Sequence, residues 1–284
     1  MTAPVTLVAP TRTARRARPP LTVVVSGIVT LFFVGAVVIP GVLSTHSPLR
    51  TDLDNVLDAP SFTHLLGTDN AGRDLYSRIV WGTRESLSIG VGAVVVALII
   101  AVVLGFAAGI GPRWVAAPVN RLLEILLAFP TLLLALLLVT LLGPSAQSLV
   151  IAVGIGTAPG YARLIRAQAL GVENSGYVEA ARAMGHTRRT IFRQHIFPNA
   201  LRPLLALFTL GIGQCVVWAS GLSFLGLGVA APSSEWGVLL NEGKSEILSA
   251  WWLEVFPGTA IVLVALGVTQ IGRYLQDRAE GTTT

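Results

Sequence analysis

The feature that most limits how this chain can fold is a run of 38 residues, from Ile125 to Ala162, that contains no charged side chain. A helix rises about 1.5 Å per residue, so this run would form a single helix roughly 57 Å long. The hydrocarbon core of a membrane is only about 30 Å thick. The run must therefore fold back on itself, and Gly143-Pro144-Ser145 has the residue types of the turn.

The composition also points to a membrane, because 53% of the 284 residues are hydrophobic and only 12% are charged. A water-soluble core cannot bury so much apolar surface. At about 20 apolar residues per crossing, the sequence predicts an all-α integral membrane protein with six transmembrane helices. The first apolar stretch, Leu21 to Leu43, is too long for a secretory signal. We expect the spans at 21–43, 86–111, 121–142, 149–170, 201–221 and 254–272.

The basic residues predict which ends of these helices lie in the cytoplasm. With both termini inside, the inner segments hold 15 of the 20 basic residues, and the outer segments hold ten of the fifteen acidic ones. This clustering between apolar runs indicates topology and gives no reason to expect a nucleic-acid partner. The predicted parts are a basic cytoplasmic tail (1–20), a first transmembrane helix (21–43), an extracytoplasmic loop (44–84), a five-helix core (85–275) with an inner loop (171–198), and a cytoplasmic tail (276–284).

The inner loop between the fourth and fifth spans has helical periodicity. Small side chains at Ala180, Ala181 and Ala183 would let another protein approach closely, and Gly185 permits a sharp turn between two short helices. Pro198 is expected to stop the second helix. Two interpretations are open: a lever that another protein moves, or an amphipathic helix resting on anionic lipid.

The order of residues in this loop resembles a known family. Glu179-Ala180-Ala181, three residues, Gly185, nine residues, and then His195-Ile196-Phe197-Pro198 is similar to the EAA loop of binding-protein-dependent ABC importers. Phe197 stands where the family usually has leucine. The resemblance implies that the loop docks on an ATPase subunit and transmits its closure to the membrane. The implied coupling residues are Glu179, Ala180, Ala181, Gly185 and Pro198.

Further stretches resemble the dipeptide, oligopeptide and nickel branch of that family. Leu66–Asp74 is similar to its LGTDxxGRD motif, and this motif together with the six spans resembles the C-type of its two permeases. Other matching stretches are Ala128-Phe129-Pro130, Pro159–Arg163, Gly221–Gly228 and Trp236-Gly237. The candidate residues for a translocation path or gate are Phe129, Pro130, Gly221, Phe224, Gly226 and Gly228.

The outer segment before the second span holds two sets of polar residues. Asp69, Arg73 and Asp74 either pin a loop to the second span or contact a binding protein. The second set is His46, Asp52, Asp54, Asp58 and His64, whose spacing fits no fixed metal-ligand pattern. We therefore expect a solvated acidic loop and no metal there.

The resemblance implies a complex in the bacterial inner membrane. Its partners would be a B-type permease, one or two ABC ATPase subunits and an extracytoplasmic substrate-binding protein, with substrate passing between the two permeases. The implied cargo is a di- or oligopeptide, and the alternative is nickel or another metal chelate. ATP and Mg²⁺ would bind the ATPase, because this chain has no phosphate-binding Gly-x-x-x-x-Gly-Lys-Ser/Thr loop. We expect no cofactor on this chain.

Two other classes of protein remain as alternatives. A secondary transporter or channel usually carries ionisable groups at mid-membrane, and the central parts of these spans have none. An intramembrane enzyme needs a nucleophile, base or metal ligands grouped at depth, and no such group occurs, so no catalytic residue is predicted.

Overall fold

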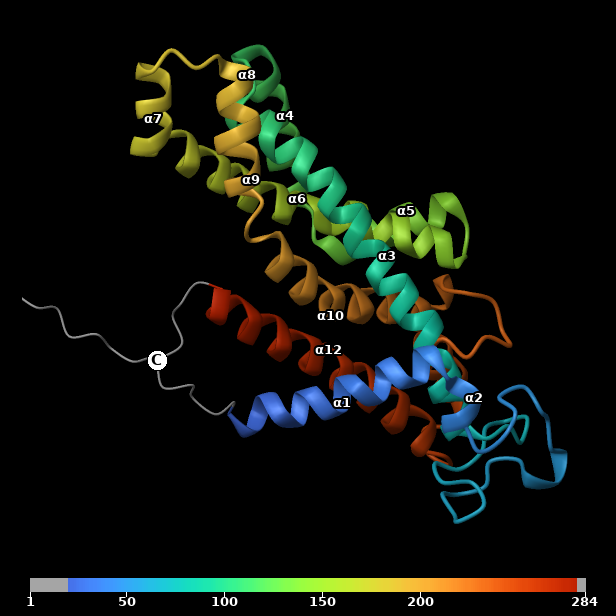
Figure 1. Cartoon of the computed structure of the whole chain (residues 1–284). Helices are drawn as coiled ribbons and strands as arrows, with labels where there is room; N and C mark the ends of the chain where they lie inside the picture. Colours follow the sequence, from blue (N-terminus) through green and yellow to red (C-terminus); the bar gives the residue numbers. More distant parts are fainter. Residues whose placement is uncertain (1–19, 280–284) are drawn as a thin grey trace, which may run out of the picture.

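The computed structural model describes residues 20–279, and this part of the chain is helical apart from loops and one isolated bridge between Thr68 and Asp74 (Figure 1). The long helices are α1 (Leu21–Val38), α3 (Leu75–Ile110), α4 (Arg113–Ala128), α5 (Thr131–Leu142), α6 (Ala146–Glu173), α10 (Leu204–Leu222) and α12 (Trp252–Ala279). The short ones are α2 (Pro40–Leu43), η1 (Leu53–Asn55), α7 (Gly176–Ala183), α8 (Arg188–Ile191), η2 (Phe192–Ile196), α9 (Phe197–Ala200), η3 (Ser223–Leu227), α11 (Trp236–Gly243) and η4 (Lys244–Glu246).

Five of the described helices are long and apolar enough to cross a membrane, and there are six candidate spans if the bent pair α4 and α5 counts as one. The predictions for residues 1–19 and 280–284 lie outside the described residues. In Figure 1 the start of α1 and the end of α12 lie on the same side as α7, and the loop at 44–74 lies at the opposite end. This arrangement agrees with the predicted topology, in which both ends of the helical part and the inner loop lie on one side of the membrane. That this side faces the cytoplasm stays a prediction.

The second span is longer at its outer end than the sequence indicated. We expected it to begin at Ser86, after a loop at 44–84, but α3 begins at Leu75 and has 36 residues. The Asp74 side chain caps this helix by accepting a hydrogen bond from the Ser77 backbone N–H. Hydrogen bonds and ion pairs hold the Ser77 hydroxyl and the two terminal nitrogens of Arg78 in these added turns, which offsets the cost of burying polar side chains there.

The third span, predicted over 121–142, is formed by two helices that meet at a sharp bend. The chain breaks at Phe129-Pro130, where α4 and α5 meet at a bend of 95°. Proline at 130 cannot supply the backbone N–H that a continuous helix needs. The predicted hairpin turn is present: α5 ends at Leu142, Gly143 takes a φ of +84°, and Ser145 caps α6.

Helix α3 is the centre of the packing and contributes to all three clusters of buried apolar residues. Its most extensive contact is with α6, where small residues let the two backbones approach. A Cβ atom at Gly105 would lie 2.8 Å from the carbonyl oxygen of Ala162, closer than real contacts allow. Helices α1 and α12 pack beside α3 at one edge, and α10 lies between α3 and α12.

Candidate functional site

The loop between α6 and α10 forms two short helical pieces, as the sequence indicated. Helix α7 begins after Ser175, and Gly185 follows it with a φ of +82°, a conformation that glycine adopts readily. The second piece begins at Thr187, whose side chain caps α8, and runs through the π-helical η2 into α9. Pro198 does not stop this piece as we predicted. It lies in the first turn of α9, and the helical piece ends two residues later, at Ala200.

Helix α7 divides into a packed face and an exposed face. Val178 and Ala181 are buried against the rest of the protein, whereas Glu179, Ala180 and Gly185 are exposed. Of the five predicted coupling residues, Ala181 therefore holds the helix in place, while the others, Pro198 included, lie at the surface. The loop therefore exposes a face with small and charged side chains. The buried residues Val178 and Ala181 fix the position of this face.

Three phenylalanines connect this loop to α3. The Phe197 ring stacks on Phe106 of α3 with centroids 5.4 Å apart, and Phe192 meets Phe106 edge to face at 5.5 Å. Phe192 and Phe197 also contact each other. The sequence drew attention to Phe197 only as a departure from the family pattern, and nothing in the apolar run around Phe106 marked it as the partner. A movement of the loop would reach α3 directly through these rings.

An open cavity of about 940 Å³ lies between the end of α3 and the loop. Basic side chains dominate its polar lining, which includes Arg182, Arg188 and Arg189. Arg182 also pairs with Glu173 at 3.1 Å, which ties α7 to the end of α6. The positive lining favours an acidic surface as the neighbour of this end of the molecule.

A buried group of charges lies at the opposite end. Asp69 accepts hydrogen bonds from Arg73 at 2.7 Å and from Arg78 at 2.6 Å. Glu242, at the end of α11, accepts from Arg78 at 2.6 Å and from Arg73 at 3.3 Å. Two cations and two carboxylates thus neutralise one another, so the cost of burying them is offset.

This ion-pair network gives the 66–74 segment its structural role. Gly67 and Gly72 both take positive φ values and form turns in this segment. The side chains of Asp69, Arg73 and Asp74 are almost wholly buried, which fits the interpretation that they pin the loop to α3. A binding protein would contact the exposed residues around these three side chains. Their burial therefore gives no support to the alternative that they contact a binding protein themselves. Arg78 and Glu242 were not predicted, because no motif marks them.

Two carboxyl groups of the outer segments have shifted pKa values. Burial opposes ionisation of Asp74, but hydrogen bonds from Ser77 and His64 outweigh it and hold its pKa below the ordinary value. Burial raises the pKa of Glu235 even though its carboxylate accepts from the Gly237 and Val238 backbone N–H groups, each at 3.0 Å. Asp74 is also close to His46 and His64, and these three side chains could hold a metal ion.

Residues 101–281, about two thirds of the chain, match the sequence profile of the family described as "Binding-protein-dependent transport system inner membrane component". The chain belongs to this family. The permease is 42% identical over 250 residues to the dipeptide transport system permease protein DppC of Alkalihalophilus pseudofirmus, covering 88% of this chain and 82% of that protein. It is 39% identical over 226 residues to the glutathione transport system permease protein GsiD of Pectobacterium atrosepticum, covering 80% and 75%.

Solved structures support the fold of the permease. An inward-facing structure of the MetNI methionine ABC transporter matches with a TM-score of 0.57 at 19% identity, over 69% of this chain and 94% of that one. An amino acid ABC transporter crystallised with histidines matches with a TM-score of 0.56 at 17% identity, over 71% and 94%. Family membership favours a permease over the secondary transporter, channel and intramembrane enzyme that the sequence left as alternatives.

The predicted gate residues of the permease lie on two separate elements. Phe129 and Pro130 form the exposed bend between α4 and α5, while Gly221 is in the last turn of α10, Phe224 and Gly226 lie in η3, and Gly228 follows it. Gly226 has a φ of +84° and breaks the helical path inside η3. Asn241 donates to the carbonyl of Phe224 at 2.7 Å, and the Lys244 ammonium lies 5.7 Å from the Phe224 ring centroid. Helix α5 contacts η3, which brings the two elements next to each other.

Proposed function

We propose that this chain is the C-type permease subunit of an ATP-driven, binding-protein-dependent importer of di- or oligopeptides. A B-type permease would complete the path, an ATPase would dock on the inner loop, and an extracytoplasmic binding protein would deliver the cargo in the bacterial inner membrane. The relatives named for dipeptide and glutathione transport support a short peptide as cargo. ATP and Mg²⁺ would bind the partner ATPase.

The observation that carries this proposal is the geometry of the inner loop. Glu179 and Ala180 are exposed on α7, while Val178 and Ala181 behind them are buried. A face of small residues on a helix that is held by its neighbours suits a firm contact with a second protein. The aromatic contacts from Phe192 and Phe197 to Phe106 would pass its movement to α3.

Copurification tests the docking step. The tagged permease, expressed with its own partner subunits, should retain the ATPase in mild detergent. Glu179→Lys should lose it, because the charge is reversed at the exposed face. Glu124→Lys is the matched control, because it makes the same charge reversal at an exposed glutamate of α4, outside the loop. Gly185→Pro should also lose the ATPase, because proline fixes φ near −65° where the turn needs +82°.

Uptake into proteoliposomes tests the cargo. The reconstituted complex should accumulate labelled dipeptide only with ATP inside and binding protein outside, and Glu179→Lys should abolish uptake although the protein is inserted normally. Glutathione and a nickel chelate serve as competing cargoes. Normal uptake by Glu179→Lys at normal expression would refute docking at this face, and transport of the chelate alone would refute a peptide cargo.

A further inference from the structure

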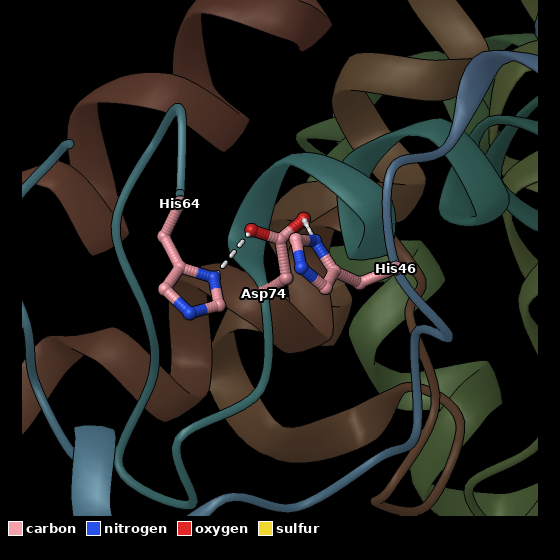
Figure 2. Close-up of side chains that lie close together, drawn as sticks. All are labelled: His46, His64 and Asp74. Atoms are coloured by element: carbon pink, nitrogen blue, oxygen red, sulfur yellow. Dashed lines mark hydrogen bonds and ion pairs between the residues drawn. The ribbon is translucent and has the colours of Figure 1, made fainter. Parts of the chain in front are cut away.

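Two histidines and an aspartate that are distant in the sequence meet at the outer end of α3. Asp74 caps the helix, and His46 and His64 come from the loop that precedes it. Figure 2 shows the Asp74 carboxylate between the two imidazole rings. One ligand atom from each residue lies within 4.8 Å of the others. The loop at 44–74 thus gathers a set of donors that its sequence spacing did not reveal.

The distances fit a metal site in its empty form. In a tetrahedral site with metal–nitrogen and metal–oxygen bonds of about 2.1 Å, two neighbouring ligand atoms are roughly 3.4 Å apart. His64 Nδ1 lies 3.0 Å from Asp74 Oδ1, and His46 Nδ1 lies 3.8 Å from Asp74 Oδ2. The two nitrogens approach different oxygens of the carboxylate, so one imidazole must turn before both nitrogens and a single oxygen meet at one ion. The imidazole centroids are 5.0 Å apart, so small rotations of the two rings would bring both nitrogens onto one ion.

Asp74 is held in place through one of its two carboxylate oxygens, which leaves Oδ1, the oxygen beside His64, for an ion. Its Oδ2 accepts hydrogen bonds from the Ser77 backbone N–H at 2.9 Å and from the Thr45 hydroxyl at 3.3 Å. Such outer contacts orient a ligand and are typical of metal sites in proteins. The Asp74 carboxylate is almost fully buried, whereas the His64 side chain is 15% and the His46 side chain 39% exposed, so an ion can enter from the side of His46.

An open cavity of about 220 Å³ adjoins the cluster and leaves room for a further ligand. Its lining includes both imidazoles, Asp74, Asp52 and Arg50. Asp52 adds negative charge near the ion, and the Arg50 cation opposes it. Two neutral imidazoles and one carboxylate are a donor set that favours a borderline divalent transition metal over Mg²⁺ or Ca²⁺, which prefer oxygen.

We propose that His46, His64 and Asp74 bind one divalent transition metal ion of the zinc class, with water in the remaining position. The sequence argument against a metal rested only on the spacing of the residues along the chain. The fold brings His46, His64 and Asp74 together in spite of that spacing. The bound ion clamps both sides of the 44–74 loop to the first turn of α3. This site is independent of cargo and of the ATPase, so it can exist even if the proposed function is wrong.

Zinc binding by the purified full chain tests the proposal. The chain is purified in detergent with a tag that lacks histidine, stripped of metal, and titrated with Zn²⁺ in competition with a chromogenic chelator. We expect one equivalent of tightly bound Zn²⁺ and a higher unfolding temperature when it is bound. Mg²⁺ in large excess should displace none of it. Absence of any zinc binding stronger than that of the chelator would refute the proposal.

The four histidines of the chain supply matched variants. The double variant His46→Gln and His64→Gln should no longer bind the one equivalent of Zn²⁺. The double variant His186→Gln and His195→Gln, at the opposite end, should keep it, although its rings are also neighbours at 6.2 Å. Retention by the first variant, or loss by the second, would assign the zinc elsewhere and overturn the proposal.

X-ray absorption at the zinc edge identifies the atoms that hold the ion, and it replaces the first double variant if that variant fails to fold. The wild-type spectrum should show two imidazoles and a mixed nitrogen and oxygen shell. A shell of oxygen alone, or one with sulfur from the single cysteine, would contradict the assignment to these three residues.

Discussion

Arg78 and Glu242 lie 164 residues apart in the sequence, yet Arg78 Nη1 donates a hydrogen bond to Glu242 Oε2 at 2.6 Å. Arg78 is in the second turn of α3, and Glu242 is near the end of α11. The same guanidinium nitrogen also binds Asp69 at 2.6 Å, and Nη2 binds the Ser233 carbonyl at 2.7 Å. One buried arginine therefore joins the loop before α3 to the loop and helix before α12.

Arg78→Met should destabilise the permease by about 3 to 5 kcal/mol, because the buried Asp69 carboxylate and the partly buried Glu242 carboxylate would be left with one cation fewer. Arg84→Met is the control, since Arg84 is on the same helix but exposed. Unfolding can be followed by maleimide labelling of Cys215, the single cysteine, which is fully buried in the folded chain. Equal unfolding temperatures for the two variants would contradict the role given to Arg78.

Gly105→Ala should destabilise the contact between α3 and α6 by about 1 to 3 kcal/mol, because the added methyl group overlaps the Ala162 carbonyl and Ile165. Gly160→Ala on α6 makes the same chemical change where no atom lies within 4 Å of the new carbon. It should be neutral or stabilising by up to about 1 kcal/mol, since alanine favours a helix. Cys215 labelling measures both, and a Gly105→Ala protein as stable as Gly160→Ala would refute the close approach.

Phe197→Ala should loosen the inner loop from α3, because two aromatic contacts worth about 1 to 3 kcal/mol together are lost. Phe197→Leu keeps most of the apolar contact and should have a smaller effect. Trypsin cleavage at Arg188, Arg189 or Arg193 requires this segment to open, so its rate reports the change. We expect faster cleavage in Phe197→Ala than in Phe197→Leu. The same rate in both would show that the stacking on Phe106 does not hold the loop.

Glu235 should make the permease less stable as the pH rises. Its pKa in the folded chain is raised above the ordinary value of 4.5 by burial, with Glu85 adding repulsion. The favourable contribution of the protonated form is therefore fully present below about 4.5 and is lost as the pH rises through the folded-state pKa. Glu235→Gln should remove this dependence. The stability of the variant relative to the wild type should therefore be higher at pH 8 than at pH 4.

Thermal unfolding followed by tryptophan fluorescence across this pH range, with the exposed Glu124→Gln as control, checks the prediction. A Glu235→Gln protein whose stability follows the wild-type pH profile would contradict it. The wild-type and Glu124→Gln profiles should coincide.

The candidate site could be predicted from sequence where a pattern is local. The EAA-like order located α7 and the turn at Gly185, because a short helix and a glycine turn depend on neighbouring residues. The same local reasoning failed at Pro198, since its effect depended on whether a new helical turn began there. Ala181 is buried and Phe197 contacts Phe106 because other helices pack against the loop. No local sequence pattern identifies which helices those are.

The sequence by itself determined that this protein is helical, that it has about six apolar segments and that the 38-residue run folds back at Gly143. Hydrophobicity and helical rise decide these features, and both can be counted along the chain. Only the tertiary structure decided that Arg78 joins Glu242, that His46 and His64 meet Asp74, and that α4 and α5 meet at 95°. These contacts depend on the relative positions of distant segments, which are set by packing around α3.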